Sequence, residues 1–288
     1  MKILFISKFD LPDFQNDMIF HGLRSLYGVN VIPSNDPWYM YTDMHKKWNL
    51  IVPNNGMSYG RGFTLYGKLL KIPVDNSNIQ KKVQDRWFDK IIYGSITRCD
   101  DYFVDVVKSY KSNDILCIDG EDNTDINHNY SKHSVYFKRE LIHTPSENIR
   151  PIGFCIPSDL IVKNIPHKEQ DYGTVIPGDS STYIFNSEID YFKDYQKSYF
   201  GLTHRKGGWD CLRHYEILMN GCIPYFPDIS KCPQFTMTNF PKDIINITNE
   251  IIKNGQFNIS RYNNICEELL HICSEKLTTV HMASTILS

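Results

Sequence analysis

The feature that most restricts the fold of this 288-residue chain is an alternation of short apolar runs with helical segments in its first half. The runs are rich in β-branched and aromatic side chains, as buried strands are. They fall at residues 2–7, 29–33, 49–53, 90–96, 114–119 and 134–141, and helical patterns cover 16–27 and 100–109. Strands that alternate with helices predict an α/β domain with a largely parallel sheet.

The second half repeats this style. We expect a strand near 173–177 or 182–185, a helix over 187–197, a strand at 199–203, a helix from Asp210 and a strand at 223–226. Between the halves, residues 149–168 carry three prolines and no helical period, which is typical of a domain boundary. The sequence therefore predicts two α/β domains, 1–155 and 156–288, with a last helix that packs back on the first.

Composition excludes several classes of protein. Hydrophobic residues make up 41% of the chain and charged residues 22%, as in globular proteins, and a net charge of −2 argues against broad electrostatic binding of nucleic acid. The first apolar run is interrupted by Lys8 and Asp10, so it predicts a strand instead of a signal peptide, and no run has membrane-spanning length. The eight cysteines form no CxxC pair, so we expect reduced thiols in a cytoplasmic protein and no structural zinc.

The stretch from Gly201 to Phe226, GLTHRKGGWDCLRHYEILMNGCIPYF, places a basic, glycine-rich loop between an apolar run and a helix. In an open α/β sheet, ligands collect at the carboxyl ends of strands, where loops meet helix N-termini. Gly207 and Gly208 permit close approach to a ligand, Arg205 and Lys206 add positive charge, and Asp210 is a candidate N-cap. These features predict a phosphate or diphosphate site.

Arg213 and Glu216 lie three residues apart, on one face of the predicted helix. A guanidinium suits phosphate oxygens and a carboxylate suits the paired hydroxyls of a ribose, so the pair indicates a nucleotide. The alternative is an ordinary surface pair worth ~0.3 kcal/mol beside an ordinary turn. Neither the GxxxxGK[ST] motif of ATPases nor the GxGxxG motif of dinucleotide folds occurs.

The segment 200–224 resembles the C-terminal signature of exostosin-like glycosyltransferases. The match rests on Arg205, Arg213, the aromatic Tyr215, Glu216 and the Gly-Cys-Ile-Pro turn at 221–224. The chain departs from that signature where Gly-Gly-Trp-Asp-Cys replaces a serine-rich approach to the arginine, and it lacks the membrane anchor usual in eukaryotic members. A cytoplasmic relative encoded by a virus or microbe is therefore expected.

The resemblance implies a GT-B-like fold, with two Rossmann-like domains facing a cleft, and a nucleotide-sugar donor, preferably a UDP-sugar. It implies a donor site on the second domain formed by Arg205, Lys206, Gly207, Gly208, Arg213 and Glu216. It further implies inverting transfer of a hexosyl or pentosyl group to a hydroxyl of a glycan or glycoprotein. Basic groups and the helix N-terminus would replace the metal cation, so no cofactor is expected.

Loops of the first half are expected to supply the acceptor side and the catalytic base. Asp17 and His21 lie four residues apart on one helical face and are candidates for a carboxylate–imidazole pair that acts as the catalytic base. An acid that favours a helix N-terminus, beside a solvated histidine, explains the two residues equally well. Tyr59 and Arg61 lie in a glycine-rich aromatic loop that is predicted to line the cleft.

Asp119, Glu121 and Asp122 end a buried-type strand, with Lys138 and Arg139 after the next one. Glu121 is a third catalytic candidate, and the two basic residues are expected in the cleft. One alternative is a metal-dependent GT-A-type transferase that uses Asp119 and Glu121. Turn acids without a catalytic role, or a non-catalytic module that binds glycans or nucleotides, are further alternatives.

Overall fold

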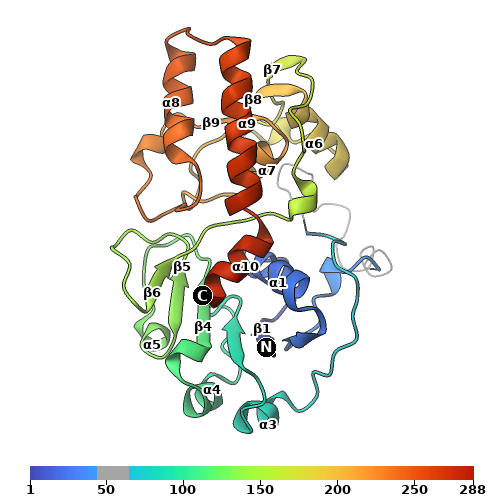
Figure 1. The fold of residues 1–288 in the computed structure, drawn as a ribbon, viewed down its shortest axis with the longest axis vertical. Helices are drawn as coiled ribbons and strands as arrows, with labels where there is room; N and C mark the ends of the chain where they lie inside the picture. Colours follow the sequence, from blue (N-terminus) through green and yellow to red (C-terminus); the bar gives the residue numbers. More distant parts are fainter. Residues whose placement is uncertain (44–64) are drawn as a thin grey trace.

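A computed structural model describes residues 1–43 and 65–288, and they form two parallel β-sheets, each flanked by helices (Figure 1). The α/β class and the two Rossmann-like halves expected from the sequence are confirmed. Among the described residues, no helix combines the length and the apolar character needed to cross a membrane.

The first sheet has the order β2-β1-β3-β4-β5-β6, with every neighbouring pair parallel. Its strands are β1 (Ile3–Ile6), β2 (Val31–Pro33), β3 (Lys90–Tyr93), β4 (Ile115–Asp119), β5 (Val135–Lys138) and β6 (Ile149–Pro151). Every residue of β1, β4 and β5 is buried, because the sheet is covered on both faces. The strand order reverses between β1 and β3, and a ligand is expected beyond the carboxyl ends of strands at such a point.

The helices of this unit are α1 (Phe14–Tyr27), α3 (Ile79–Gln84), α4 (Phe103–Ser109) and α5 (His128–Ser131). One face of the sheet packs against α3 and α4 through a cluster that includes Val83 and Val106. The other face packs against α1 in a second cluster, which continues through α10 (Thr279–Leu287) into helices of the second unit. This second cluster is therefore shared by the two units.

The second sheet has the order β7-β8-β9, also parallel. Its strands are β7 (Gln170–Tyr172), β8 (Ser198–Leu202) and β9 (Ile223–Tyr225), and its helices are α6 (Glu188–Gln196), α7 (Leu212–Met219), α8 (Lys242–Lys253) and α9 (Ile259–Lys276). The prediction of a strand at 173–177 or 182–185 was wrong, because the strand in this part of the chain is β7, which lies earlier. Ser180–Thr182 instead form a 3₁₀ turn, which begins where the Asp179 side chain accepts a hydrogen bond from Ser181 N.

The C-terminal helix α10 lies beside α1 in the first unit, after α9 has carried the chain back from the second (Figure 1). His21 Nδ1 and Thr279 Oγ1 are 2.9 Å apart across this contact. Gly22 lets the two helices meet closely, because a Cβ at this position would overlap the carbonyl of Thr279.

We predict that Gly22→Ala destabilises the protein by ~1–3 kcal/mol, because the added methyl group overpacks the contact between α1 and α10. On an isolated helix the same change would be stabilising. The measurement is the urea midpoint of unfolding, with Ser25→Ala on the exposed side of α1 as the matched control. A Gly22→Ala variant as stable as the wild type would contradict the prediction.

Candidate functional site

A pocket of about 350 Å³ lies between the two units. The first unit contributes the loops that follow β1, β3, β4 and β5, and the second contributes the loop after β8 and the first turns of α7. Its lining includes Asp13, Gln15, Arg98, Glu121, Asp122, Arg139, Lys206, Gly207, Gly208, Arg213 and Glu216. Because strand ends of both sheets converge here, this is the candidate site.

A larger groove, of about 990 Å³, lies between the connection at 158–168 and α9. It is lined by the connecting segment, one side of α9 and Tyr199 of the strand β8, and by no loop at a strand's carboxyl end. Its size alone does not make it the functional site.

The loop 204–210 approaches the first unit closely. A Cβ at Gly207 would overlap the carboxylate of Asp122, and a Cβ at Gly208 would overlap that of Glu140. Neither glycine has a positive φ, so both are needed for space. The sequence predicted that these glycines leave space for a ligand. The structure shows that they leave space for the carboxylates of Asp122 and Glu140 in the other unit.

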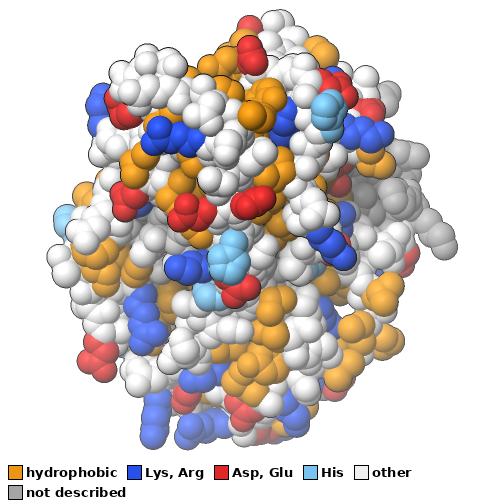
Figure 2. Space-filling model, turned by 45° about the horizontal axis from the view of Figure 1, so that its top comes forward, with side chains coloured by type: hydrophobic (Ala, Val, Ile, Leu, Met, Phe, Trp, Pro, Cys, Tyr) orange, Lys and Arg blue, Asp and Glu red, His pale blue; other side chains and the backbone are white. Residues whose placement is uncertain are grey.

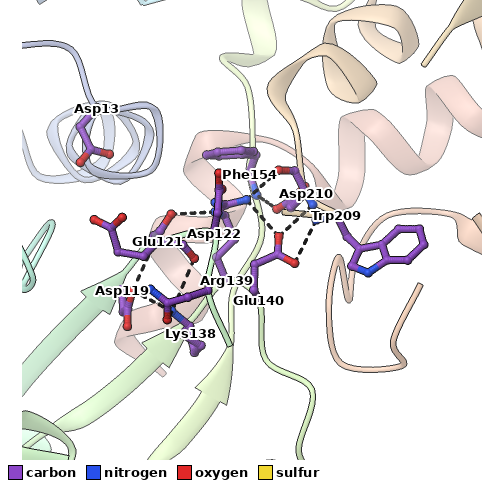
Figure 3. Close-up of polar contacts among 12 residues, drawn as sticks. Asp13, Asp119, Glu121, Asp122, Lys138, Arg139, Glu140, Phe154, Trp209 and Asp210 are labelled. Atoms are coloured by element: carbon purple, nitrogen blue, oxygen red, sulfur yellow. Dashed lines mark hydrogen bonds and ion pairs between the residues drawn. The ribbon is translucent and has the colours of Figure 1, made fainter. Parts of the chain in front are cut away.

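Glu140 and Arg139 bind the backbone of this loop (Figure 3). The Glu140 carboxylate accepts hydrogen bonds from Trp209 N (3.0 Å) and Asp210 N (2.9 Å). The Arg139 guanidinium donates to Asp210 O (2.6 Å) and Gly120 O (2.9 Å) and pairs with Asp122. Glu140 and Arg139 are each 2% exposed, so their charge-assisted bonds to Trp209 and Asp210 are shielded from water.

Asp210 is not the N-cap that the sequence suggested. Its carboxylate accepts hydrogen bonds from Phe154 N and Tyr215 OH, both at 2.8 Å, and α7 begins after Cys211, which makes no side-chain cap. Burial raises the pKa of Asp210 to about 6, against the lowering effect of Arg139. The first turn of α7 is therefore fixed by tertiary contacts instead of a capping side chain.

Glu216 lies in α7 and lines the pocket, as expected. Its Oε2 accepts a hydrogen bond from Tyr191 OH (2.8 Å), whereas Oε1 has no hydrogen-bond partner among the described residues. The side chain is buried, and burial raises its pKa to about 7. A buried carboxylate oxygen without a donor is costly for the protein alone, and a ligand hydroxyl would satisfy it.

Arg213 is in the same helix and also lines the pocket. Its Nη2 donates a hydrogen bond to Tyr183 OH (3.0 Å), and the guanidinium lies 5.5 Å from the centre of the Tyr183 ring. Lys206 lines the pocket with an exposed side chain. Arg205 instead lies over the Trp209 ring at 5.3 Å and is not a lining residue.

The opposite wall is acidic and held by one arginine. Arg98 Nη1 donates to Asp13 Oδ2 (2.7 Å), and Arg98 Nε donates to Glu121 Oε1 (3.0 Å). Partial burial acts to raise the pKa of Glu121, but its bonds with Arg98 outweigh this and lower the pKa. Glu121 therefore presents an ionised carboxylate to the pocket.

The predicted carboxylate–imidazole pair of Asp17 and His21 does not form, and neither residue lines the pocket. Asp17 is fully buried and accepts hydrogen bonds from Asp13 N, Asn16 Nδ2 and Tyr39 OH at 2.7–2.9 Å. His21 contacts α10, and burial lowers its pKa to about 4. Both side chains face the interior, where they hold the start of α1 and its packing on α10.

Other predicted residues are divided between the pocket and the interior. Arg139 reaches the pocket, but Lys138 is fully buried and pairs with Asp119 at 3.0 Å (Figure 3). Asp119 also accepts hydrogen bonds from Glu121 N and Tyr136 OH, so both its oxygens are used. Tyr59 and Arg61 lie outside the described residues. Within 1–43 and 65–288, no group of three or more His, Cys, Asp or Glu side chains is arranged to hold a metal ion.

Several lining residues were given no role from the sequence, chiefly Asp13, Gln15 and Arg98, and Glu140 was missed behind the pocket. Asp13, Arg98 and Glu140 follow β1, β3 and β5 at the carboxyl edge of the sheet. Their place after strands was the available signal. The sequence alone does not separate them from other loop residues.

No protein-family model matches the sequence, and no curated protein matches it. Among solved structures, an alpha-glucosyltransferase in complex with UDP and a 13-mer DNA containing a HMU base aligns with a TM-score of 0.44 and 11% identity, over 99% of this chain and 98% of that one. Anabaena Alr3699/HepE in complex with UDP and glucose aligns with a TM-score of 0.49 and 9% identity over the same shares. The GtfA/B complex aligns at 0.40 and 9%, over 72% and 58%. At these scores the likenesses assign no family, and the resemblance to exostosin-like enzymes stays a prediction.

We predict that Glu216→Gln stabilises the protein relative to wild type as pH rises from 5 to 8. The folded pKa of about 7 lies above the ordinary value of 4.5, so folding disfavours the ionised form, and wild-type stability falls across this interval. The effect is at most about 3 kcal/mol. Urea midpoints at pH 5 and pH 8 measure it, with the exposed Glu268→Gln as control. A pH-independent difference between Glu216→Gln and wild type would refute the raised pKa.

Proposed function

We propose that this protein is a glycosyltransferase that moves a sugar from a nucleotide-sugar donor, preferably a UDP-sugar, to a hydroxyl of a glycan or glycoprotein. The observation that carries the proposal is that one pocket combines two features. Glu216 has an Oε1 atom without a hydrogen-bond partner among the described residues, and the loop 204–210, which we call the donor loop, is basic and contains glycines. Ribose hydroxyls are donors that suit the first, and a diphosphate is an anion that suits the second.

The proposed roles follow from the walls of the pocket. Glu216 receives the ribose, while Lys206, Arg213 and the start of α7 stabilise the departing nucleoside diphosphate. Of the three predicted catalytic residues, Glu121 alone lines the pocket, and we propose it as the carboxylate that acts on the acceptor hydroxyl. Inversion at the sugar carbon and independence of metal ions are parts of this proposal.

We propose domains 1–155 and 156–288, with α10 of the second joined to the first. We also propose an acceptor other than nucleic acid. On the wall formed by the first unit, the three carboxylates of Asp13, Glu121 and Asp122 outnumber the two guanidinium groups that pair with them, which disfavours a phosphate backbone. The face drawn in Figure 2 mixes acidic, basic and hydrophobic side chains and shows no continuous basic surface.

We predict that wild-type protein binds UDP and pyrophosphate, and that Glu216→Gln weakens UDP about tenfold without changing the affinity for pyrophosphate. Only UDP carries the ribose that Glu216 is proposed to bind, and a hydrogen bond to a charged group is worth ~1.5–3 kcal/mol. Lys206→Met, the control, should weaken both ligands. Isothermal titration calorimetry measures the affinities, and an equal loss of both ligands in Glu216→Gln would remove the ribose assignment.

Turnover separates an enzyme from a binding module. We expect the wild type to release UDP from a UDP-sugar in the presence of EDTA, because basic side chains take the place of a cation. Glu121→Gln should lower this rate at least tenfold while UDP affinity is unchanged. A UDP-release assay over a panel of UDP-sugars measures both. Restoration of activity by manganese alone would favour a metal-dependent transferase, and UDP binding without turnover would favour a non-catalytic module.

A further inference from the structure

We propose that Glu140 is a positioning residue for the donor, although it never touches it. Its carboxylate, on the first unit, holds the donor loop of the second unit in the shape that receives the diphosphate. The inference rests on the proposed function, because the loop's ligand is the proposed donor.

The first step of the argument is the path of hydrogen bonds through the loop. Trp209 N donates to Glu140, and Trp209 O faces His214 Nε2 of α7 at 2.9 Å. Asp210 N also donates to Glu140, so the peptide unit that joins Trp209 and Asp210 contacts Glu140 of the first unit through its N–H and His214 of α7 through its carbonyl. The preceding turn is closed by Lys206 N, which donates to Gly208 O (3.1 Å). The lining residues 206–208 are thus held from Glu140 on one side and from α7 on the other.

The second step is the close fit between Glu140 and Gly208. Gly208 is buried, and any side chain there would overlap the Glu140 carboxylate. Arg139 Nη1 donates to Glu140 Oε1 at 3.1 Å, which fixes the direction of the carboxylate. The close contact and the hydrogen bond from Arg139 hold the loop and the carboxylate against each other, as expected of a support for a binding site.

The third step excludes the opposite role. Two successive backbone N–H groups can bind an anion, so Glu140 could in principle compete with the donor's phosphate for Trp209 N and Asp210 N. However, Glu140 is 2% exposed and does not line the pocket. A donor in the pocket meets residues 206–208 and Arg213, and Glu140 supports them from behind.

The test uses the full chain and Glu140→Gln. The amide keeps the shape but offers one acceptor where the carboxylate offers two, and its NH₂ group faces a backbone donor. We expect UDP to bind about tenfold more weakly and the amides of 204–211 to exchange hydrogen faster, since charge-assisted bonds are lost. Glu147→Gln, at an exposed site on the same unit, is the matched control and should change neither.

Gly208→Ala and a double variant separate positioning from general damage to the fold. The alanine methyl displaces the loop from an intact Glu140, so the same loss of UDP affinity is expected. If both changes act through one contact, the double variant loses no more than the weaker-binding single variant. Thermal unfolding shows whether Glu140→Gln folds. If it does not, the UDP affinity of Gly208→Ala alone decides the question.

The outcomes distinguish the two proposals. Faster loop exchange with unchanged UDP affinity in Glu140→Gln overturns the positioning role and leaves the proposed function intact. Tighter UDP binding also overturns it, because Glu140 would then be a competitor. Failure of the wild type to bind UDP or any other nucleotide overturns the proposed function, whatever the loop exchange shows.

Discussion

The candidate site depends on a buried, charged contact between the two units. Glu140 and Arg139 belong to the loop after β5, and together they bind three backbone groups at Trp209 and Asp210, which lead into α7. Buried charges are tolerated when they are paired and fully hydrogen-bonded, and removing one partner leaves the others uncompensated. The shape of the pocket between the sheets therefore depends on this hydrogen-bond network, and a change at any one of its residues would disturb it.

A second set of contacts, around the start of α1, stabilises the wall of the pocket that contains Asp13. The N-cap and first turn of α1 carry the pocket residues Asp13 and Gln15, and the middle of the helix packs on α10. Asp17 joins these functions, because its carboxylate bonds to Asp13 N and to Tyr39 OH. Sequence spacing suggested that Asp17 and His21 were catalytic, and the structure makes them supports of the wall that the acceptor is proposed to meet.

Features of the fold and the site could be predicted where they depend on residues close together in the sequence. Alternating apolar runs predicted the parallel sheets, since buried strands such as β4 need continuous apolar sequence. The three-residue strand β7 was misplaced, because Gln170–Tyr172 has no apolar pattern and becomes a strand by pairing with β8. Within the site, Arg213 and Glu216 were found because helical spacing is local, whereas Glu140 acts on residues 69 and 70 positions away. Helical spacing also placed Asp17 and His21 on a shared face without saying that this face is buried.

Two carboxylates in or beside α7 show how stability and function are divided. Asp210 has donors for both its oxygens, from Phe154 N and Tyr215 OH, and contributes to holding the units together. Within the part of the chain that the structure describes, Glu216 has one donor, Tyr191 OH, and a buried oxygen without one, which is destabilising for the free protein. Natural sequences keep such local conflicts mainly where a ligand resolves them. The contrast between a satisfied and an unsatisfied carboxylate, six residues apart, is the reason for proposing that the nucleotide binds at Glu216 and that Asp210 has a structural role.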